Sequence, residues 1–486
     1  MGGSFPRGVR AKMGGAKGFG QGWGGLGWSK PPHVMGGPAM LTHEQNETLT
    51  RTGPNTAMGN LFRRFWLPVL LSRELPDADG APKRVRILGE DLIAFRDTEG
   101  RVALMEARCP HRGAHLFFGR NEEGGVRCAY HGWKFGADGG CLDIPTMSRD
   151  TPGYGALRAR ARLISYPTRE WGDYVWAYMG PEAAMPGLPE MEFAMVPPAH
   201  RFVSKKLQEC NWAQAAEGGI DTAHFSFLHA PLHLEGTSLG TMTRGYAPQT
   251  MGSDQVRWMV NDGTPRYKVT KHPAGLVLAG ARHADDGALY WRIAQYLMPC
   301  HSFAPGTAPG ETYHGQTWVP IDDGNCWIYT YSWNPDRPLS EAERAAYAGG
   351  ASIHAEVDAD FVPVRRREND YLIDREMQKT VNYSGIKGIS EQDQAIQDSQ
   401  GRIHDRTREL LGPTDLGVSS FRMLMLEAAR DLAAGREPAA AGAPEAYRVR
   451  SGAIVAPAGL AFGAVMRRRF GDVDGRFDRA DSDAAA

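Results

Sequence analysis

Residues 109–133 read CPHRGAHLFFGRNEEGGVRCAYHGW, and this stretch decides how the rest of the chain is interpreted. It contains two cysteine–histidine pairs, Cys109 with His111 and Cys128 with His131. Two thiolates and two imidazoles on short loops are the ligand set of a 2Fe–2S centre in which two histidines replace two cysteines on one iron. Structural zinc sites use the same residue types, but zinc fingers usually keep the cysteines in one short pair and the histidines in the other. The mixed pairs therefore favour an iron–sulfur cluster over zinc.

Short runs of Val, Ile, Leu and Phe surround this stretch. In residues 82–110 the runs are separated by Gly–Glu and Glu–Gly pairs, which is typical of antiparallel strands joined by tight turns. A further strand-like run at residues 174–180, YVWAYMG, is expected to close the first domain. The Pro-rich segment that follows predicts a domain boundary near residue 190.

Residues 211–231, NWAQAAEGGIDTAHFSFLHAP, contain two further candidate metal ligands, His224 and His229. On a regular helix five residues turn through about 500°, which leaves the two rings roughly 140° apart. The histidines can therefore share one ion only if the helix ends, kinks or bulges between them. We interpret Gly218 and Gly219, together with Pro231, as signals of such an irregularity. Two imidazoles completed by one carboxylate form the facial triad of mononuclear non-haem iron oxygenases.

Three stretches together resemble the oxygenase (alpha) subunit of Rieske non-haem iron aromatic-ring-hydroxylating oxygenases, in the phthalate-dioxygenase-like branch. They are the cysteine–histidine pattern, the segment that ends at His229, and EQDQAIQDSQGRIHDRTRELLGPTDLGV at residues 391–418. The resemblance implies an α+β fold, in which an antiparallel β Rieske domain precedes a helix-grip catalytic domain with a curved antiparallel sheet. It also implies one Rieske 2Fe–2S cluster and one mononuclear non-haem Fe(II).

The third ligand of the mononuclear iron is implied by the resemblance to be Asp393, which joins His224 and His229. Sequence chemistry alone leaves other carboxylates open as alternatives, namely Glu391, Asp398 and Asp405. The cluster ligands implied by the same resemblance are Cys109, His111, Cys128 and His131.

Asp221 lies three residues before His224 and is implied to link that iron ligand to His131 of a neighbouring subunit. Such a carboxylate fixes the tautomer of the imidazole and gives electrons a short path between the two centres. Other candidates for groups that hold the ligands in place are Asn211, Gln214 and Glu217. His233 is nine residues from His224 and is expected to face away from the iron.

Four domains or segments are expected along the chain. They are a disordered glycine-rich tail (1–39), the Rieske domain (40–190), the catalytic iron domain (191–434) and a low-complexity or extended C-terminal tail (435–486). Because the first segment has no apolar periodicity, we expect that the native chain starts at Met35 or Met40. The remaining cysteines are scattered singly and are expected to be packed thiols, namely Cys141, Cys210, Cys300 and Cys326.

The resemblance also implies partners. A separate NAD(P)H-dependent reductase with flavin and an iron–sulfur centre is expected to supply electrons, because no GxGxxG motif follows a strand in this chain. Dioxygen and an aromatic substrate, expected to be an aromatic carboxylate such as a phthalate, would react at the mononuclear iron. Monooxygenation, O-demethylation and aryl-ether cleavage with the same metal set remain alternatives. Transfer of electrons between subunits implies a homotrimer or two stacked trimers.

Three arginines of the predicted catalytic domain could pair with substrate carboxylates, namely Arg244, Arg282 and Arg292. Each is better explained as a surface or structural residue, so none is assigned to the site. The 486 residues are 42% hydrophobic and 23% charged, with a formal net charge of −1. This balance gives no reason to expect a nucleic-acid or membrane partner. No run of 18 apolar residues occurs, so we expect a cytoplasmic protein without a membrane span.

Overall fold

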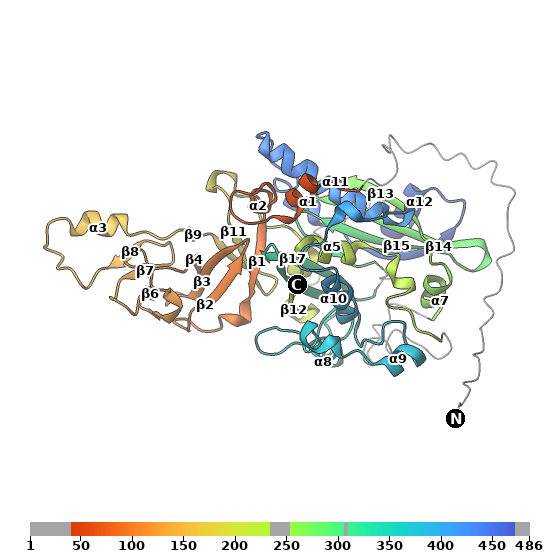
Figure 1. Cartoon of the computed structure of the whole chain (residues 1–486), viewed down its shortest axis with the longest axis horizontal. Helices are drawn as coiled ribbons and strands as arrows, with labels where there is room; N and C mark the ends of the chain where they lie inside the picture. The colour runs from red at the N-terminus through yellow and green to blue at the C-terminus, as the bar shows by residue number, and fades with distance from the viewer. Residues whose placement is uncertain (1–39, 234–252, 306–309, 472–486) are drawn as a thin grey trace, which may run out of the picture. The chain divides into compact units, whose positions relative to one another are not determined.

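Antiparallel sheets form the framework of the computed structural model, which describes residues 40–233, 253–305 and 310–471 (Figure 1). The strands are β1 (Trp66–Leu71), β2 (Lys83–Ile87), β3 (Glu90–Arg96), β4 (Val102–Glu106), β5 (Arg120–Glu122), β6 (Gly125–Arg127), β7 (Lys134–Gly136), β8 (Cys141–Asp143), β9 (Ser165–Tyr166), β10 (Thr168–Trp171), β11 (Tyr174–Tyr178), β12 (Arg201–Gln208), β13 (Arg266–His272), β14 (Gly275–His283), β15 (Ala288–Leu297), β16 (His301–Phe303), β17 (Tyr313–Asp322), β18 (Asn325–Trp333) and β19 (Gly452–Pro457). The α-helices are α1 (His43–Thr50), α2 (Ala57–Phe62), α3 (Tyr154–Arg160), α4 (Glu192–Met195), α5 (Trp212–Ile220), α7 (Ser253–Asn261), α8 (Glu341–Ala348), α9 (Arg375–Thr380), α10 (Ile389–Ser399), α11 (Leu416–Ala433) and α12 (Phe462–Phe470). The α+β class is confirmed.

Two small sheets enclose the core around the first cysteine–histidine stretch. Their strand orders are β2-β3-β4-β9 and β5-β6-β7-β8. Alternate side chains of these strands, such as Ile93 and Phe135, are buried between the sheets. Cys109 and Cys128 belong to the same buried cluster, so the two loops that carry them rest directly on this core.

The large sheet has the strand order β12-β18-β17-β16-β15-β14-β13, and β19 pairs with β15. Most residues of strands β14 and β15 are apolar, and nearly all of their residues are buried. Continuous burial means that both faces of these strands are covered, since successive side chains point to opposite faces. One face packs with α5 and α11 into the largest core of the described residues.

The opposite face of β14 and β15 corrects the expectation for the C-terminus. Residues 435–471 do not form an extended tail, because they contain β19 and α12. Val465 and Met466 of α12 pack on Val277, Ala279 and Ile293 of the sheet. An uncovered face of this kind would expose a continuous apolar patch, so the segment completes the catalytic domain. Residues 472–486 lie outside the described residues, as does the predicted N-terminal tail.

Helices α1 and α2 fall within the range predicted for the Rieske domain but pack against α11. The Nε1–H of Trp212 in α5 donates to the carbonyl oxygen of Leu49 at 3.2 Å, which fixes α1 on the same layer. The Rieske strands are also joined to the large sheet, because the N–H groups of Leu88 and Gly89 donate to carbonyl oxygens of β17 at 2.9 Å. The boundary near residue 190 stays a prediction.

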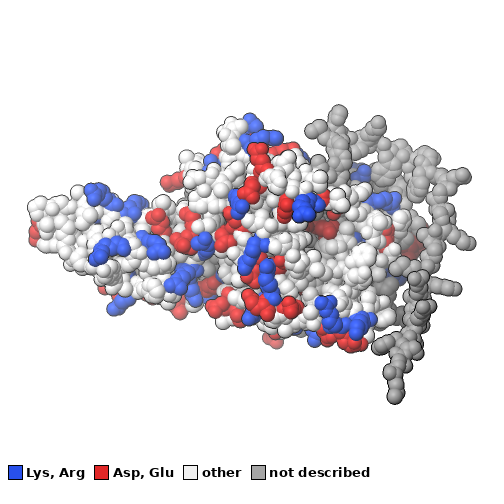
Figure 2. Space-filling view, in the orientation of Figure 1, with Lys and Arg blue, Asp and Glu red and all other residues white. Residues whose placement is uncertain are grey.

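The predicted helix at residues 415–434 corresponds to α11 (Leu416–Ala433), with Asp415 at the N-cap position. The Asp415 carboxylate makes no cap bond to the helix and instead accepts the N–H of Gly412 at 2.6 Å. Lys and Arg side chains mix with Asp and Glu side chains on the face shown in Figure 2. None of the helices within the described ranges combines the length and apolarity needed to cross a bilayer.

Candidate metal centres

The two cysteine–histidine pairs lie on loops that share one backbone design. In each loop the cysteine N–H donates to a carbonyl oxygen five residues later, and the cysteine carbonyl oxygen accepts an N–H from a glycine four residues later. Both glycines have positive φ, +72° at Gly113 and +73° at Gly132, which a glycine adopts without steric cost. The four bonds are Cys109 N to Ala114 O (2.9 Å), Gly113 N to Cys109 O (2.9 Å), Cys128 N to Trp133 O (2.8 Å) and Gly132 N to Cys128 O (2.9 Å).

This backbone brings the four predicted cluster ligands together. The ring centroids of His111 and His131 are 4.5 Å apart, and Trp133 stacks on His111 at 4.5 Å. Burial, together with the neighbouring Cys128 thiol, raises the pKa of Cys109 to about 11. The buried Nδ1 of His131 has no hydrogen-bond partner among the described residues. Close thiols and a buried imidazole nitrogen without a partner fit a bound cluster, because a metal takes up both thiolate charge and nitrogen lone pairs.

The second pair of histidines meets because the helix before it ends. Helix α5 stops at Ile220, and Asp221 has extended backbone angles. His224 begins a short 3-10 turn, η5 (His224–Ser226), which ends at Phe227 with φ −126° and ψ −65°. The chain then turns back, and the Nε2 atoms of His224 and His229 lie 3.1 Å apart. The helix end that the shared site requires is therefore present.

Gly218 and Gly219 do not cause this helix end, contrary to our interpretation of the sequence. Both lie inside α5 and serve close packing. A Cβ atom on Gly218 would lie 2.0 Å from the side-chain nitrogen of Gln397, and one on Gly219 would lie 2.1 Å from the indole ring of Trp318. The two glycines therefore allow α5 to approach α10 and β17.

Asp393 on α10 completes the group. Its Oδ1 atom lies 3.2 Å from Nε2 of His229 and 3.5 Å from Nε2 of His224. Ligand atoms about 2.1 Å from a common ion lie about 3.0 Å apart at right angles and about 3.4 Å apart in a tetrahedron. The three observed spacings fall in or near that range. Among the described residues, this is the one set of three or more His, Cys, Asp or Glu side chains with ligand atoms close enough to share an ion.

Hydrogen bonds at the far side of each ring determine where the protons lie. Nδ1 of His224 lies 3.2 Å from Oδ2 of Asp221, and Nδ1 of His229 lies 2.6 Å from Oε1 of Gln392. Because both acceptors are oxygens, both Nδ1 atoms carry the proton and both Nε2 atoms carry a lone pair. Two lone pairs and a carboxylate oxygen facing one point repel each other unless a cation lies between them. The arrangement fits a divalent metal.

Gln392 was missed in the sequence, where only its carboxylate neighbours were considered. Its amide nitrogen donates to the carbonyl oxygen of Ile386 at 2.8 Å, so its oxygen is the atom that faces His229. Gln392 thus accepts a hydrogen bond from Nδ1–H of His229, as Asp221 does from Nδ1–H of His224. The available signal was its position directly beside Asp393 in the run EQDQ.

Asp221 is itself held in place. Its Oδ1 atom accepts the N–H of Ala223 at 2.7 Å and the hydroxyl of Tyr267 at 3.2 Å. Burial opposes ionisation, but the bond to His224 holds the pKa of Asp221 below its usual range. Burial also disfavours a charged His224, yet Asp221 raises the pKa of that imidazole above its ordinary value. Within one described chain His131 is not among the partners of Asp221.

The alternative carboxylates lie elsewhere. Asp398 accepts the hydroxyl of Tyr371 at 2.8 Å, and burial raises its pKa. Asp405 accepts the hydroxyl of Thr407 at 2.6 Å. Glu391 is buried and faces the N–H of Glu356 at 3.4 Å. His233 is exposed and belongs to no metal group of the described residues.

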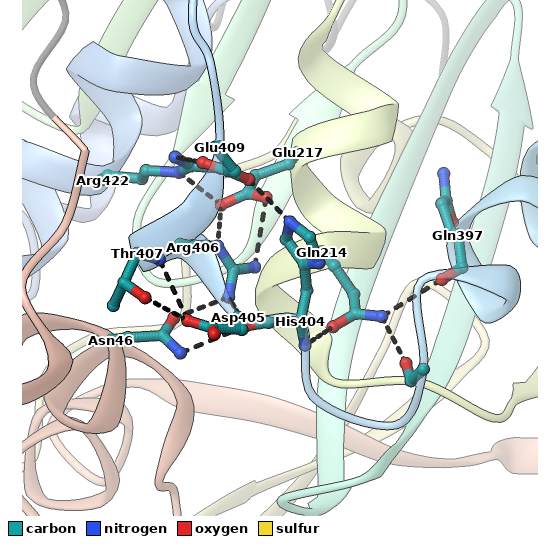
Figure 3. Close-up of polar contacts among 11 residues, drawn as sticks. Asn46, Gln214, Glu217, Gln397, His404, Asp405, Arg406, Thr407, Glu409 and Arg422 are labelled. Atoms are coloured by element: carbon teal, nitrogen blue, oxygen red, sulfur yellow. Dashed lines mark hydrogen bonds and ion pairs between the residues drawn. The ribbon is translucent and has the colours of Figure 1, made fainter.

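Asn211, Gln214 and Glu217 do not touch the metal ligands and instead fasten α5 to its surroundings. Glu217 is the centre of the network in Figure 3, where it accepts bonds from Arg406 at 2.9 and 3.1 Å and from Arg422 at 2.8 Å. Gln214 bonds to backbone groups around Gly401 and His404. These three residues therefore fix the position of the helix that leads into His224.

Comparisons with known proteins agree with this geometry. The family described as Rieske [2Fe-2S] domain matches residues 65–167, and the one described as LigXa C-terminal domain like matches residues 177–459. The chain is 37% identical over 421 residues to the phthalate 4,5-dioxygenase oxygenase subunit of Pseudomonas putida, covering 83% of this chain and 89% of that protein. This chain belongs to the Rieske oxygenases. The Rieske match also decides against a zinc site.

Two further relatives show the range of this oxygenase family. The 3-chlorobenzoate-3,4-dioxygenase oxygenase subunit of Comamonas testosteroni is 36% identical, over 80% of this chain and 89% of that protein. The 5,5'-dehydrodivanillate O-demethylase oxygenase subunit of Sphingobium sp. is 29% identical, over 82% and 83%. The crystal structure of dicamba monooxygenase bound to dicamba shares the fold, with a TM-score of 0.51 at 17% identity over 78% of this chain and 100% of that one. As a Rieske oxygenase the protein uses a 2Fe–2S cluster and a mononuclear non-haem iron.

Proposed function

We propose that two groups of side chains hold these metals. The cluster ligands are Cys109, His111, Cys128 and His131, and the iron ligands are His224, His229 and Asp393. The observation that carries the proposal is the convergence of two imidazole lone pairs and one carboxylate oxygen, with both Nδ1 protons bonded elsewhere. When bound, a ferrous ion with three protein ligands on one side supplies open positions at which dioxygen can react.

The remaining side chains of the site keep the ligands in one tautomer and one orientation. Asp221 and Gln392 each fix the Nδ1 proton of one histidine, so that Nε2 is free to bind. Tyr267 holds the Asp221 carboxylate against His224. His229 is almost fully buried, whereas the side chains of His224 and Asp393 remain about one quarter exposed, at 25% and 24%. Substrate and dioxygen therefore approach from the side of His224 and Asp393.

Asp221 is also proposed to pass electrons between two copies of the chain. Its carboxylate remains 22% exposed, so it can accept a hydrogen bond from His131 of a neighbouring copy. This contact requires a ring of identical subunits, which we propose to be a homotrimer or two stacked trimers. A separate NAD(P)H-dependent reductase, with flavin and an iron–sulfur centre, supplies the electrons, which fits a cytoplasmic location.

The proposed reaction is hydroxylation of an aromatic carboxylate with dioxygen. Support comes from the relatives named for phthalate and 3-chlorobenzoate, which are 37% and 36% identical to this chain. A second candidate is monooxygenation or O-demethylation, because a 29% identical relative is named for O-demethylation. Labelled dioxygen separates the two. Dihydroxylation places two labelled oxygen atoms in the aromatic product and ring monooxygenation places one, whereas O-demethylation places none there because the label leaves with the methyl carbon as formaldehyde.

Asp221→Asn tests the proposal. With reductase, NADH and a panel of aromatic carboxylates, we expect about 100-fold slower oxygen uptake, at the upper end of the range for such supporting carboxylates. Both metals should stay bound, as judged by iron content and the absorbance of the cluster. Asp431→Asn is the control, because Asp431 pairs with Arg436 at 2.6 Å at the exposed C-terminal end of α11. Full oxygen uptake by Asp221→Asn would contradict the electron path.

A further inference from the structure

One face of β14 and β15 carries buried cations close to the proposed iron ligands. Tyr290 and Arg292 are two residues apart on β15 and so point to the same face, and Arg282 of β14 pairs directly with Tyr290. The Cζ atom of Arg292 lies 5.0 Å from the ring centre of Phe225. The Phe225 ring in turn lies 5.3 Å from the His229 ring. One aromatic ring therefore separates Arg292 from His229.

The buried arginines of the described residues fall into two groups. Arg201 pairs with Asp173, and Arg406 and Arg422 pair with Glu217. Arg282 and Arg292 are also buried, at 0% and 7% exposed, but have no carboxylate partner among the described residues. A buried cation without an anion costs several kcal/mol, so such a pair is expected where a ligand brings the negative charge.

The bonds of the two arginines distinguish them. Arg282 donates to the carbonyl oxygens of Asp262 at 3.0 Å and Thr222 at 2.5 Å, and thereby holds the turn that contains Asp221. Burial, together with the nearby charge of Arg292, lowers the pKa of Arg282 to about 10. Arg292 donates to the carbonyl oxygen of Pro305 at 3.1 Å and lies against the sulfur of Met259, but its Nε–H has no partner. Arg244 lies outside the described residues.

The Tyr290 hydroxyl is a second buried donor without a partner in the described part of the chain. Its side chain is 1% exposed and belongs to an apolar cluster with Phe225, Val256 and Met259. Neighbouring positions on one face of a strand are about 6.6 Å apart, a gap that one carboxylate spans when each oxygen accepts one bond. The surrounding apolar groups suit the ring that would carry this carboxylate.

We infer that the Tyr290 hydroxyl and the Arg292 Nε–H bind a carboxylate group of the aromatic substrate, with its ring against Phe225. This inference rests on the proposed function, whose substrate class it explains. Arg282 adds a second positive charge to the subsite while its donors hold the backbone. The site selects an aromatic acid over a neutral analogue of the same shape, because only the acid compensates the buried charge.

The test compares 3-chlorobenzoate with 3-chlorobenzamide, which differ in charge but hardly in shape. Binding to the holoenzyme is measured by calorimetry for the wild type, Arg292→Gln and Tyr290→Phe. We expect about 100-fold weaker binding of the acid by Arg292→Gln and about 10-fold by Tyr290→Phe, with little change for the amide. The control is Arg257→Gln. Arg257 lies on the neighbouring helix α7, is partly exposed and pairs with Asp285.

Equal affinities for the acid in wild type and both variants would overturn the subsite, as would a wild type that does not prefer the acid. Tyr290→Phe removes a single oxygen atom and decides the question if Arg292→Gln does not fold. Oxygen uptake separates this inference from the proposed function. If Arg292→Gln loses the preference for the acid but no aromatic acid supports oxygen uptake, the subsite is supported and the substrate class is rejected. If Arg292→Gln takes up oxygen with an unchanged KM for the aromatic acid, the proposed function is supported and the subsite is rejected.

Discussion

The two proposed metal sites of this oxygenase are built by different kinds of interaction. The cluster loops are shaped by backbone bonds within a few residues of each ligand, and each loop is closed by a glycine with positive φ. The iron site instead joins a helix end to a distant helix, α10, and its histidines are oriented by side chains, Asp221 and Gln392. The first centre therefore depends on local chain geometry, and the second on tertiary packing. Changes far from a ligand should harm the second centre more than the first.

The largest expected effect concerns Glu217, which fastens α5 through Arg406 and Arg422. Glu217→Gln removes the carboxylate charge that two buried guanidinium groups share, so we expect a loss of about 3–5 kcal/mol in the free energy of unfolding. Iron should leave the catalytic site at lower urea concentration while the cluster absorbance persists. The control is Glu47→Gln, because the pair of Glu47 with Arg51 is exposed and should contribute less than about 1 kcal/mol.

The same network predicts a dependence on pH. Burial opposes ionisation, but His404 and Arg422 lower the pKa of Glu409 to about 2 in the folded chain. A carboxyl group whose pKa is lower in the folded state than in the unfolded state stabilises the folded chain at pH values above the unfolded pKa of about 4.3. This contribution is lost as the pH falls toward 2. The stability difference between wild type and Glu409→Gln should therefore shrink from pH 7 to pH 3 in urea titrations. A difference that grows on acidification would contradict this account.

A smaller effect is expected when only the orientation of one ligand is disturbed. Gln392→Leu removes the acceptor that fixes the Nδ1 proton of His229, so we expect about 10- to 100-fold weaker iron binding. Ferrous ion is titrated into the iron-depleted site, with the cluster absorbance as internal standard. The control is Gln400→Leu, at the exposed C-terminal end of the same helix. Equal iron affinity in both variants would show that the Gln392 bond is not needed to orient His229.

These differences also explain what could be predicted from the sequence. The proposed cluster ligands could be selected because spacing within one short stretch determines where they lie. The proposed iron ligands could share one ion only if the helix ends, kinks or bulges between His224 and His229. In the structure α5 already ends at Ile220, and η5 ends at Phe227. Gly218 and Gly219 suggested it for the wrong reason, since they are required by Gln397 and Trp318 from other elements. Such contacts depend on packing between segments that are distant in the chain.

Two other features show the same limit. Asp393 came from the resemblance to a family, because residue chemistry alone did not separate it from the acidic side chains around it. Gln392 was overlooked because the angle between α10 and η5 decides which side chain meets His229. The C-terminal segment was misjudged because its Ala, Gly and Pro content hides β19 and α12. Its role follows only from the outer face of β14 and β15, which needs a cover.

The smallest effect is expected in the cluster loops. At Gly113, which has φ +72°, a Cβ atom would meet nothing within 4 Å, so Gly113→Ala should cost only the backbone strain of about 1–2 kcal/mol. At Gly132 the same atom would also lie 2.8 Å from Cγ of Pro145, so Gly132→Ala should cost more. We expect Gly113→Ala to keep a full cluster, as judged by visible absorbance, and to melt at a slightly lower temperature than the wild type. Gly132→Ala should melt at a lower temperature than Gly113→Ala. If Gly113→Ala lost its cluster as completely as Cys109→Ser, the loop would depend on more than its backbone bonds. The contrast between a locally built and a packing-dependent metal centre would then no longer hold.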